Sequence, residues 1–162
     1  MQRLKFDEIK NASVVDNAQL RFDLRVGMGV VDAAKIVYFS RFFEFFHQAY
    51  EELLGHAGLS LGKVLAQGQW IAPLSHAEAD YLRPISLGEQ VVVRIVAARC
   101  EPHVLSPNQG GELAIGYRVE NAQGAICCVG STVHVFLEKS TMQRFPLPEA
   151  LLLALEPVII DV

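Results

Sequence analysis

Asp32 is the residue whose type and position could do chemistry, because it comes shortly ahead of a phenylalanine-rich stretch that begins at Phe39. That stretch predicts a helix, and the first turn of a helix has unpaired backbone N–H groups and the positive end of the helix dipole. A carboxylate there tends to stay ionised and can attack a carbonyl carbon or take a proton from water. The same N–H groups can hold an oxyanion. Asp is also common in turns and caps, so from this residue alone both interpretations stay open.

Other polar side chains are weaker candidates. His47 lies inside the predicted helix and could act as a second base or simply form a local hydrogen bond. His76 lies in a predicted strand, where it could orient a substrate or pair with a backbone group. Glu44 and Glu51 are expected on the polar side of the helix, and His134, which alternates with valines, is expected to face outward. The chain has no G-x-S-x-G motif, so a serine nucleophile is not indicated.

The apolar pattern predicts the elements that would position these groups. Residues 1–19 show no clear period and are expected to form a loose arm. Alternation over 20–26 predicts a strand. Apolar residues at three- and four-residue spacings over 39–54 predict a helix, with Ser40 as its N-cap and Gly55 as its stop. The helix is apolar over much of its circumference, which indicates that other elements enclose it.

Four more strands are predicted after a loop over 55–69. Their ranges are 70–82, 89–99, 112–120 and 125–137, with turns at 108–111 and 121–124 and a possible short helix over 150–155. One long helix followed by antiparallel strands is explained by a sheet whose inner face wraps the helix. This is the architecture of the hotdog fold, an α+β fold of about five strands. We expect a single domain over 1–162, in which 140–162 form a C-terminal tail.

Composition limits the classes of function. The 162 residues are 51% hydrophobic and 20% charged, which argues against disorder and against a membrane span. A net charge of -4 without a basic stripe argues against nucleic-acid binding. Charges interrupt the first ten residues where a signal peptide needs an apolar run, so we expect a cytoplasmic protein. Three cysteines without C-x-x-C spacing are expected to be free buried thiols, and neither a metal nor a cofactor is indicated.

The stretch Val30–Ser40 resembles the active-site segment of acyl-CoA thioesterases of the 4-hydroxybenzoyl-CoA type. In that family an Asp precedes two residues, a Gly, an aliphatic residue, Val, two aromatic residues and the long helix. Asp32 and the residues from Ile36 onward match, but Lys35 stands where the family has Gly. Gly tolerates a positive φ and Lys does so poorly, so this departure concerns the local backbone.

A second stretch, Pro73–Pro84 followed by Gly88 and Glu89, looks like the family's segment of aromatic, Leu, Arg and Pro residues with a later Gly and acidic residue. Together with Phe46–Glu51 these segments are most similar to the 1,4-dihydroxy-2-naphthoyl-CoA thioesterases of phylloquinone synthesis. The resemblance covers residues 20–137 and implies hydrolysis of an aromatic acyl-CoA.

The resemblance also implies roles for individual residues. Asp32 would attack the thioester carbonyl or activate a water, and the backbone N–H of Phe39 would hold the oxyanion. Apart from the resemblance, Tyr38, His47 and His76 are the candidate substrate-binding residues. The leaving thiolate has a pKa of about 8.5 and needs no strong general acid. In the resembling families the sites lie between subunits, so a homodimer or homotetramer is expected.

Three questions stay open at this stage. Arg94, Arg99 and Arg118, expected to face outward, could meet the CoA phosphates or could be solvated surface. The activity could be that of a broader acyl-CoA or acyl-carrier-protein thioesterase. A non-catalytic acyl-CoA-binding hotdog protein is a third alternative.

Overall fold

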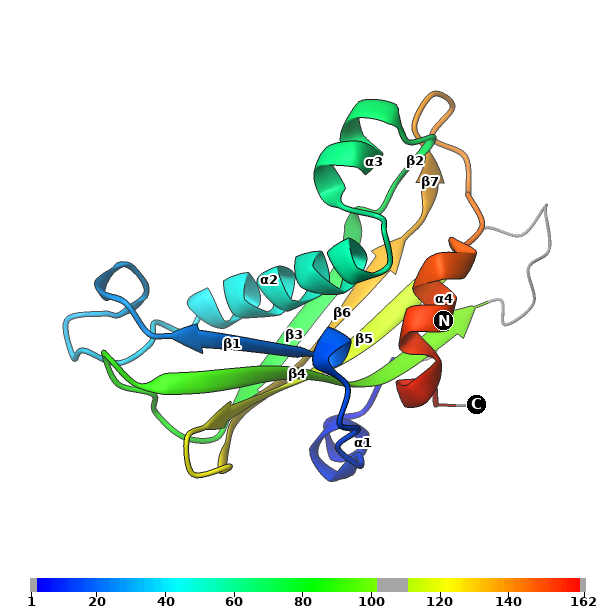
Figure 1. Cartoon of the computed structure of the whole chain (residues 1–162). Helices are drawn as coiled ribbons and strands as arrows, with labels where there is room; N and C mark the ends of the chain where they lie inside the picture. The colour runs from blue at the N-terminus through cyan, green and yellow to red at the C-terminus, as the bar shows by residue number, and fades with distance from the viewer. Residues whose placement is uncertain (1–2, 102–110, 161–162) are drawn as a thin grey trace.

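The computed structural model describes residues 3–101 and 111–160. Its main feature is an antiparallel five-stranded sheet of order β1-β4-β5-β6-β3, and a separate small sheet pairs β2 with β7 (Figure 1). The strands are β1 (Arg21–Arg25), β2 (Trp70–Ile71), β3 (Leu74–Tyr81), β4 (Gln90–Glu101), β5 (Glu112–Asn121), β6 (Ile126–Val135) and β7 (Leu137–Glu138). The helices are α1 (Phe6–Asn11), α2 (Arg41–His56), α3 (Leu61–Gln67) and α4 (Glu149–Leu155), with short 3-10 turns at Ala18–Leu20, Met28–Val30 and Glu156–Val158.

The 16-residue helix α2 lies across one face of the large sheet and builds the main core there (Figure 1). Its Phe46 ring stacks on the ring of Tyr117 in β5, with the centroids 4.8 Å apart. This close approach requires Gly130 in β6, because a Cβ at that position would lie 2.4 Å from Phe46 Cε2. The phenylalanine-rich pattern therefore forms the interface between helix and sheet, as predicted.

The structure confirms the predicted start of α2 and corrects its predicted end. Ser40 occupies the N-cap position, but its side chain makes no capping hydrogen bond. At the other end the helix continues past Gly55 to His56. Gly58, with φ +75°, ends it in a Schellman motif, in which the N–H of Leu59 donates to the carbonyl of Leu54 (2.8 Å) and the N–H of Gly58 donates to the carbonyl of Gly55 (3.0 Å).

The N-terminal segment is not a loose arm over its described residues. Helix α1 lies against the face of the sheet opposite α2 (Figure 1), where Leu4 and Ile9 are buried. Gly116 of β5 makes room for α1, since a Cβ there would lie 2.8 Å from Ile9 Cγ1. A helix of six residues spans fewer than two turns and is too short to give a recognisable period.

The predicted loop and two of the predicted strands also differ in detail. Helix α3 forms within the expected 55–69 loop. The strand expected over 70–82 is divided at Pro73, which has no N–H for a ladder bond, so that β2 leaves the large sheet and pairs with β7. The turn over 121–124 is confirmed, with Gly124 at φ +75°, whereas most of the turn expected over 108–111 lies outside the described residues. Helix α4 confirms the short C-terminal helix.

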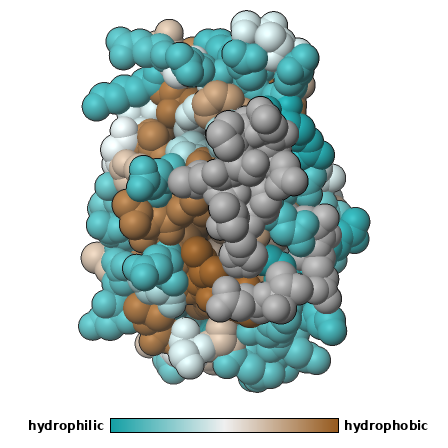
Figure 2. Space-filling view, turned by 90° about the vertical axis from the view of Figure 1, so that its right-hand side faces the viewer, coloured by the Kyte–Doolittle hydropathy of each residue, from teal (hydrophilic) through white to brown (hydrophobic). Residues whose placement is uncertain are grey.

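The three cysteines are free and buried, as expected. The helices of residues 3–101 and 111–160 include none that is both long and apolar enough to span a bilayer. On the side of the molecule that carries α4, hydrophobic surface is exposed among hydrophilic side chains (Figure 2). Leu153 of α4 is an exposed apolar residue.

Candidate active site

Asp32 lies in a tight turn that holds its carboxylate by a backbone contact. The N–H of Ala34 donates to Asp32 Oδ1 at 2.8 Å, and the N–H of Lys35 donates to the Asp32 carbonyl at 2.9 Å. Lys35 has φ +61°, so the position where the family has Gly does adopt the left-handed conformation. Among the described residues Oδ2 of Asp32 has no hydrogen-bond partner, which leaves one carboxylate oxygen available for chemistry.

The backbone at the start of α2 supplies a donor near this carboxylate. The N–H of Arg41 donates to the carbonyl of Tyr38, and the N–H of Phe43 donates to the carbonyl of Ser40. The N–H of Phe39 has no backbone or side-chain acceptor within 3–101 and 111–160. An unpaired N–H at the start of a helix is an expected consequence of helix geometry and is suited to hold a developing negative charge.

Asp32 and Phe39 line the same cavity, which has a volume of about 420 Å³. Its walls are largely aromatic, since Tyr38, Phe42 and Tyr81 also line it. The Tyr38 and Phe39 rings lie 4.6 Å apart, and the Phe42 and Tyr81 rings lie 5.3 Å apart. This volume is in the range of ordinary small-molecule sites, and such walls suit a flat aromatic ligand.

Hydrogen bonds from the end of β3 and from the loop after it fix the segment 35–39 that lines the cavity. The hydroxyl of Tyr81 donates to the carbonyl of Phe39 at 3.0 Å, and burial raises the pKa of Tyr81, which keeps this donor protonated. The N–H of Val37 donates to the carbonyl of Ile85 at 2.9 Å, and the N–H of Leu87 donates to the carbonyl of Lys35 at 3.0 Å. The two sequence stretches that carry the resemblance are therefore side by side in space.

The structure brings only some of the candidate residues together. Tyr38 and Phe39 line the cavity with Asp32, and both side chains are about half exposed. His47 lines a separate, smaller hollow and lies 3.0 Å from Glu51. His76 lies 3.5 Å from the carboxylate of Glu78, whose side chain faces the N-terminal segment rather than the cavity. Among the described residues no group of three His, Cys, Asp or Glu could hold a metal ion.

The prediction that His134 faces outward is wrong. Its ring is buried, stacks on Tyr50 at a centroid distance of 4.2 Å, and lies 3.1 Å from Thr132 Oγ1. Alternation with valines places a residue on one face of a strand but does not tell which face is the core. In β6 the face that carries His134 is covered by α2.

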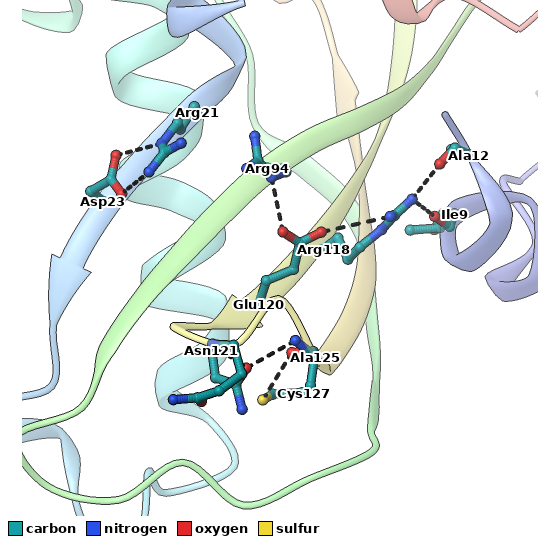
Figure 3. Close-up of polar contacts among 11 residues, drawn as sticks. Ile9, Ala12, Arg21, Asp23, Arg94, Arg118, Glu120, Asn121, Ala125 and Cys127 are labelled. Carbon is teal, nitrogen blue, oxygen red and sulfur yellow. Dashed lines mark hydrogen bonds and ion pairs between the residues drawn. The ribbon is translucent and has the colours of Figure 1, made fainter. Parts of the chain in front are cut away.

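The prediction of outward-facing arginines is wrong for Arg99 and Arg118, whose side chains hold the N-terminal segment, whereas Arg94 stays partly exposed and pairs with Glu120. Glu120 lies between Arg94 (2.9 Å) and Arg118 (3.6 Å), and Arg118 donates to the carbonyls of Ile9 (3.0 Å) and Ala12 (2.6 Å) (Figure 3). Arg118 is buried, and burial lowers its pKa.

Arg99 is held in a similar way. It donates to the carbonyl of Arg3 at 2.9 Å and lies 3.2 Å from the carboxylate of Glu8. Arg99 and Arg118 are therefore enclosed under the N-terminal segment rather than available to phosphates. Sequence reasoning instead missed Arg83, which lines the cavity. Its signal was present in the aromatic-Leu-Arg-Pro motif.

A family model and two sequence relatives all place this chain among thioesterases. The thioesterase-like superfamily matches residues 26–155. A 1,4-dihydroxy-2-naphthoyl-CoA hydrolase of Synechococcus elongatus is 31% identical over 135 residues, which cover 83% of this chain and 93% of that protein. The corresponding hydrolase of Synechocystis is 26% identical over 129 residues, which cover 79% of this chain and 88% of that protein.

Solved structures agree with this result. The crystal structure of a 1,4-dihydroxy-2-naphthoyl-CoA thioesterase from Synechocystis superposes with a TM-score of 0.71 at 25% identity, covering 83% of this chain and 93% of that chain. A Staphylococcus aureus protein solved in complex with CoA shares the fold, with a TM-score of 0.69 at 12% identity over 88% of this chain and 87% of that chain. The predicted hotdog fold and the predicted enzyme class, acyl-CoA thioesterase, are confirmed. The chain belongs to the thioesterase-like superfamily.

Proposed function

We propose that the protein hydrolyses an aromatic acyl-CoA thioester, namely 1,4-dihydroxy-2-naphthoyl-CoA, to the free acid and CoA, a step of phylloquinone synthesis. The observation that carries the proposal is one cavity that combines Asp32 with the unpaired N–H of Phe39 between aromatic walls. The names of the relatives from Synechococcus and Synechocystis support the choice of acyl group.

The proposed chemistry uses the free Oδ2 of Asp32. As a nucleophile it forms a bond to the thioester carbonyl carbon, the carbon–sulfur bond breaks, the CoA thiolate leaves, and water then hydrolyses the mixed anhydride. As a base it takes a proton from the water that attacks the same carbon. In both routes negative charge develops on the carbonyl oxygen, where the Phe39 N–H stabilises it. The contact from Ala34 to Oδ1 fixes the orientation of the carboxylate in either route.

Arg83 is the proposed contact for the anionic CoA portion, because it is an exposed cation at the cavity. Its Nη1 donates to the carbonyl of Ile126 at 2.6 Å, which leaves the other guanidinium donors for a phosphate. Arg99 and Arg118 are instead enclosed under the N-terminal segment, and Arg94 pairs with Glu120. Lys35 is exposed next to Asp32 and is the second proposed contact. Arg83→Met and Lys35→Met should each raise KM more than they lower kcat. A change confined to kcat would contradict this assignment.

We further propose that two copies of the chain pair through β3. This eight-residue strand is an edge of the large sheet and offers unpaired backbone groups. Apolar side chains at or beside it, including Leu74, Tyr81 and Leu82, are exposed in the single chain, as expected for a surface that a second copy covers. A monomer at micromolar concentration in sedimentation velocity would contradict this proposal. The cytoplasmic location expected from the sequence stays a prediction.

The substrate is tested by thiol release from a panel of acyl-CoAs. We expect the highest kcat/KM for 1,4-dihydroxy-2-naphthoyl-CoA, a lower value for 4-hydroxybenzoyl-CoA, and little turnover of acetyl-CoA or palmitoyl-CoA. Equal turnover across the panel would instead indicate a broad thioesterase, and a preference for short aliphatic chains would refute the aromatic assignment. Binding of acyl-CoA without thiol release under any condition would indicate a non-catalytic binding protein.

A further inference from the structure

A second, smaller hollow lies between α2 and the sheet, and we call it the inner hollow. It has a volume of about 90 Å³, and its lining includes His47 and Tyr50 of α2, Leu74 of β3, and Thr132 and His134 of β6. The His47 and Leu74 side chains are about half exposed, so the hollow opens at the α2–β3 edge. The volume admits a polar substituent or a few waters, but not a bicyclic ring.

The polar groups of the inner hollow form a chain whose proton positions follow from its contacts. His134 Nδ1 lies 3.3 Å from the carbonyl of Ala72, which only accepts, so Nδ1 carries the proton. Burial lowers the pKa of His134 to about 4, so the ring is neutral and Nε2 is an acceptor. Thr132 therefore donates to Nε2 at 3.1 Å, and Tyr117 donates to Thr132 Oγ1, also at 3.1 Å.

Tyr50 is the unexplained member of this hollow. Its side chain is only 3% exposed, and its hydroxyl has no hydrogen-bond partner among the described residues. Burying a hydroxyl without a partner is unfavourable, and native proteins rarely tolerate it without a ligand or water. The hollow thus combines a hydroxyl that can donate with a second lone pair on Thr132 Oγ1 that can accept. A ligand hydroxyl can satisfy both groups at once.

We propose that the inner hollow is a specificity subsite that binds a hydroxyl group of the aromatic acyl substrate through Tyr50 and Thr132, and that it serves the cavity of the partner copy. This inference rests on the proposed function and adds the residues that distinguish hydroxylated from unhydroxylated acyl groups. A hydrogen-bonding site discriminates strongly because the analogue without the hydroxyl leaves buried polar groups unpaired.

The position of the hollow along β3 explains why the partner copy is involved. Within one chain the cavity and the hollow are lined by consecutive α2 residues, Phe42 and Phe43, but along β3 the hollow reaches Ala77 and the cavity reaches Tyr81, four strand residues or about 13 Å apart. The pairing of β3 strands therefore decides which cavity each hollow serves. When two β3 strands pair antiparallel about a two-fold axis, the Tyr81 end of one strand lies beside the Leu74 end of the other. Each cavity then adjoins the inner hollow of the partner copy.

The first test compares two substrates that differ only in the ring hydroxyl distant from the thioester, 1,4-dihydroxy-2-naphthoyl-CoA and 1-hydroxy-2-naphthoyl-CoA. We expect wild type to prefer the dihydroxy substrate about tenfold in kcat/KM, the size of one good hydrogen bond. Tyr50→Phe should abolish this preference by slowing the dihydroxy substrate. A wild-type ratio near one, or a ratio unchanged by Tyr50→Phe, would refute the subsite. No thiol release from either substrate would refute the proposed function and the subsite with it.

Thermal melting separates this role from a structural one. Tyr50→Phe removes a hydroxyl that has no partner in the described chain, so its Tm should equal or exceed that of wild type. Cys100→Ser serves as a control, because it also changes one atom of a buried core side chain but lies outside both hollows. It should keep the wild-type substrate ratio. A Tm loss in Tyr50→Phe, or the same loss of ratio in the control, would contradict the assignment.

The partner arrangement is tested with a mixed dimer of an Asp32→Asn chain and a Tyr50→Phe chain, isolated through two different affinity tags. The intact Asp32 lies on the chain that carries Tyr50→Phe. If the partner supplies the hollow, this cavity uses an intact Tyr50 and shows the wild-type substrate ratio. If the ratio is that of the Tyr50→Phe homodimer, the hollow serves its own chain and the proposed arrangement is refuted.

Discussion

Replacing Lys35 by Gly should stabilise the protein, although the change removes a whole side chain. Lys35 is exposed and has φ +61° in the turn that holds Asp32. A left-handed conformation costs an L-residue about 1–2 kcal/mol, and Gly adopts it without that strain. Glycine also gives the unfolded chain more freedom, which costs about 0.4–1 kcal/mol. The net expectation is a gain of about 0.5–1 kcal/mol, or about 2 °C in Tm for a chain of this length.

The assay is equilibrium unfolding in urea of wild type and Lys35→Gly, with Lys63→Gly as the matched control. Lys63 is an exposed residue of helix α3, where Gly is unfavourable by about 1 kcal/mol. The same chemical change should therefore raise the midpoint at one position and lower it at the other. If Lys35→Gly lowers the midpoint as much as Lys63→Gly does, the turn is not strained and the argument for this backbone conformation fails.

Three further perturbations test the packing and the buried charges. In a urea titration, Gly130→Ala should lower the free energy of unfolding by about 1–3 kcal/mol, because the added Cβ would collide with Phe46. Gly29→Ala is the control: a Cβ there would have no atom within 4 Å, so the free energy of unfolding should change by less than about 0.5 kcal/mol. Burial lowers the pKa of His134 to about 4, so the stability that its neutral ring contributes is present above pH 6.5 and is lost as the pH falls toward 4. The loss amounts to about 3 kcal/mol of unfolding free energy. In urea titrations at stepped pH, the stability of His134→Gln should therefore fall less steeply in acid than that of wild type. Arg118→Met should speed limited proteolysis of the N-terminal segment, because two charged hydrogen bonds to it are lost, and an unchanged cleavage rate would contradict that role.

The elements that the sequence predicted best are those whose packing has one dominant partner. Helix α2 has a broad apolar face because it covers the sheet, and this face is visible in the sequence as apolar residues at helical spacing. The first half of β4 alternates because one of its faces meets the core, whereas β5 and β6 are buried on both faces. The hotdog fold and the thioesterase class followed from this order together with the family stretches around Asp32 and Tyr81, and both are confirmed.

The features that the sequence did not predict depend on contacts between distant segments. Helix α1 is too short to show a period in the sequence. Its position depends on Arg99 and Arg118, and charged residues of this kind are expected in solvent unless another segment covers them. The burial of His134 depends on which face of β6 meets α2, and alternation does not carry that information. The family's Gly at the position of Lys35 indicates an unusual backbone, but the sequence does not predict that Lys35 itself adopts the left-handed conformation. The catalytic roles of Asp32 and Phe39 stay predictions, although both line one cavity.

The central claim is that the Asp32 carboxylate drives thioester hydrolysis, and the most direct test is the kcat/KM of Asp32→Asn with 1,4-dihydroxy-2-naphthoyl-CoA. Asn keeps an oxygen that accepts the N–H of Ala34, so the turn and the Tm should be preserved while the ionised group is lost. We expect kcat/KM to fall by about 100-fold or more. Turnover undiminished in a folded Asp32→Asn protein would contradict the claim.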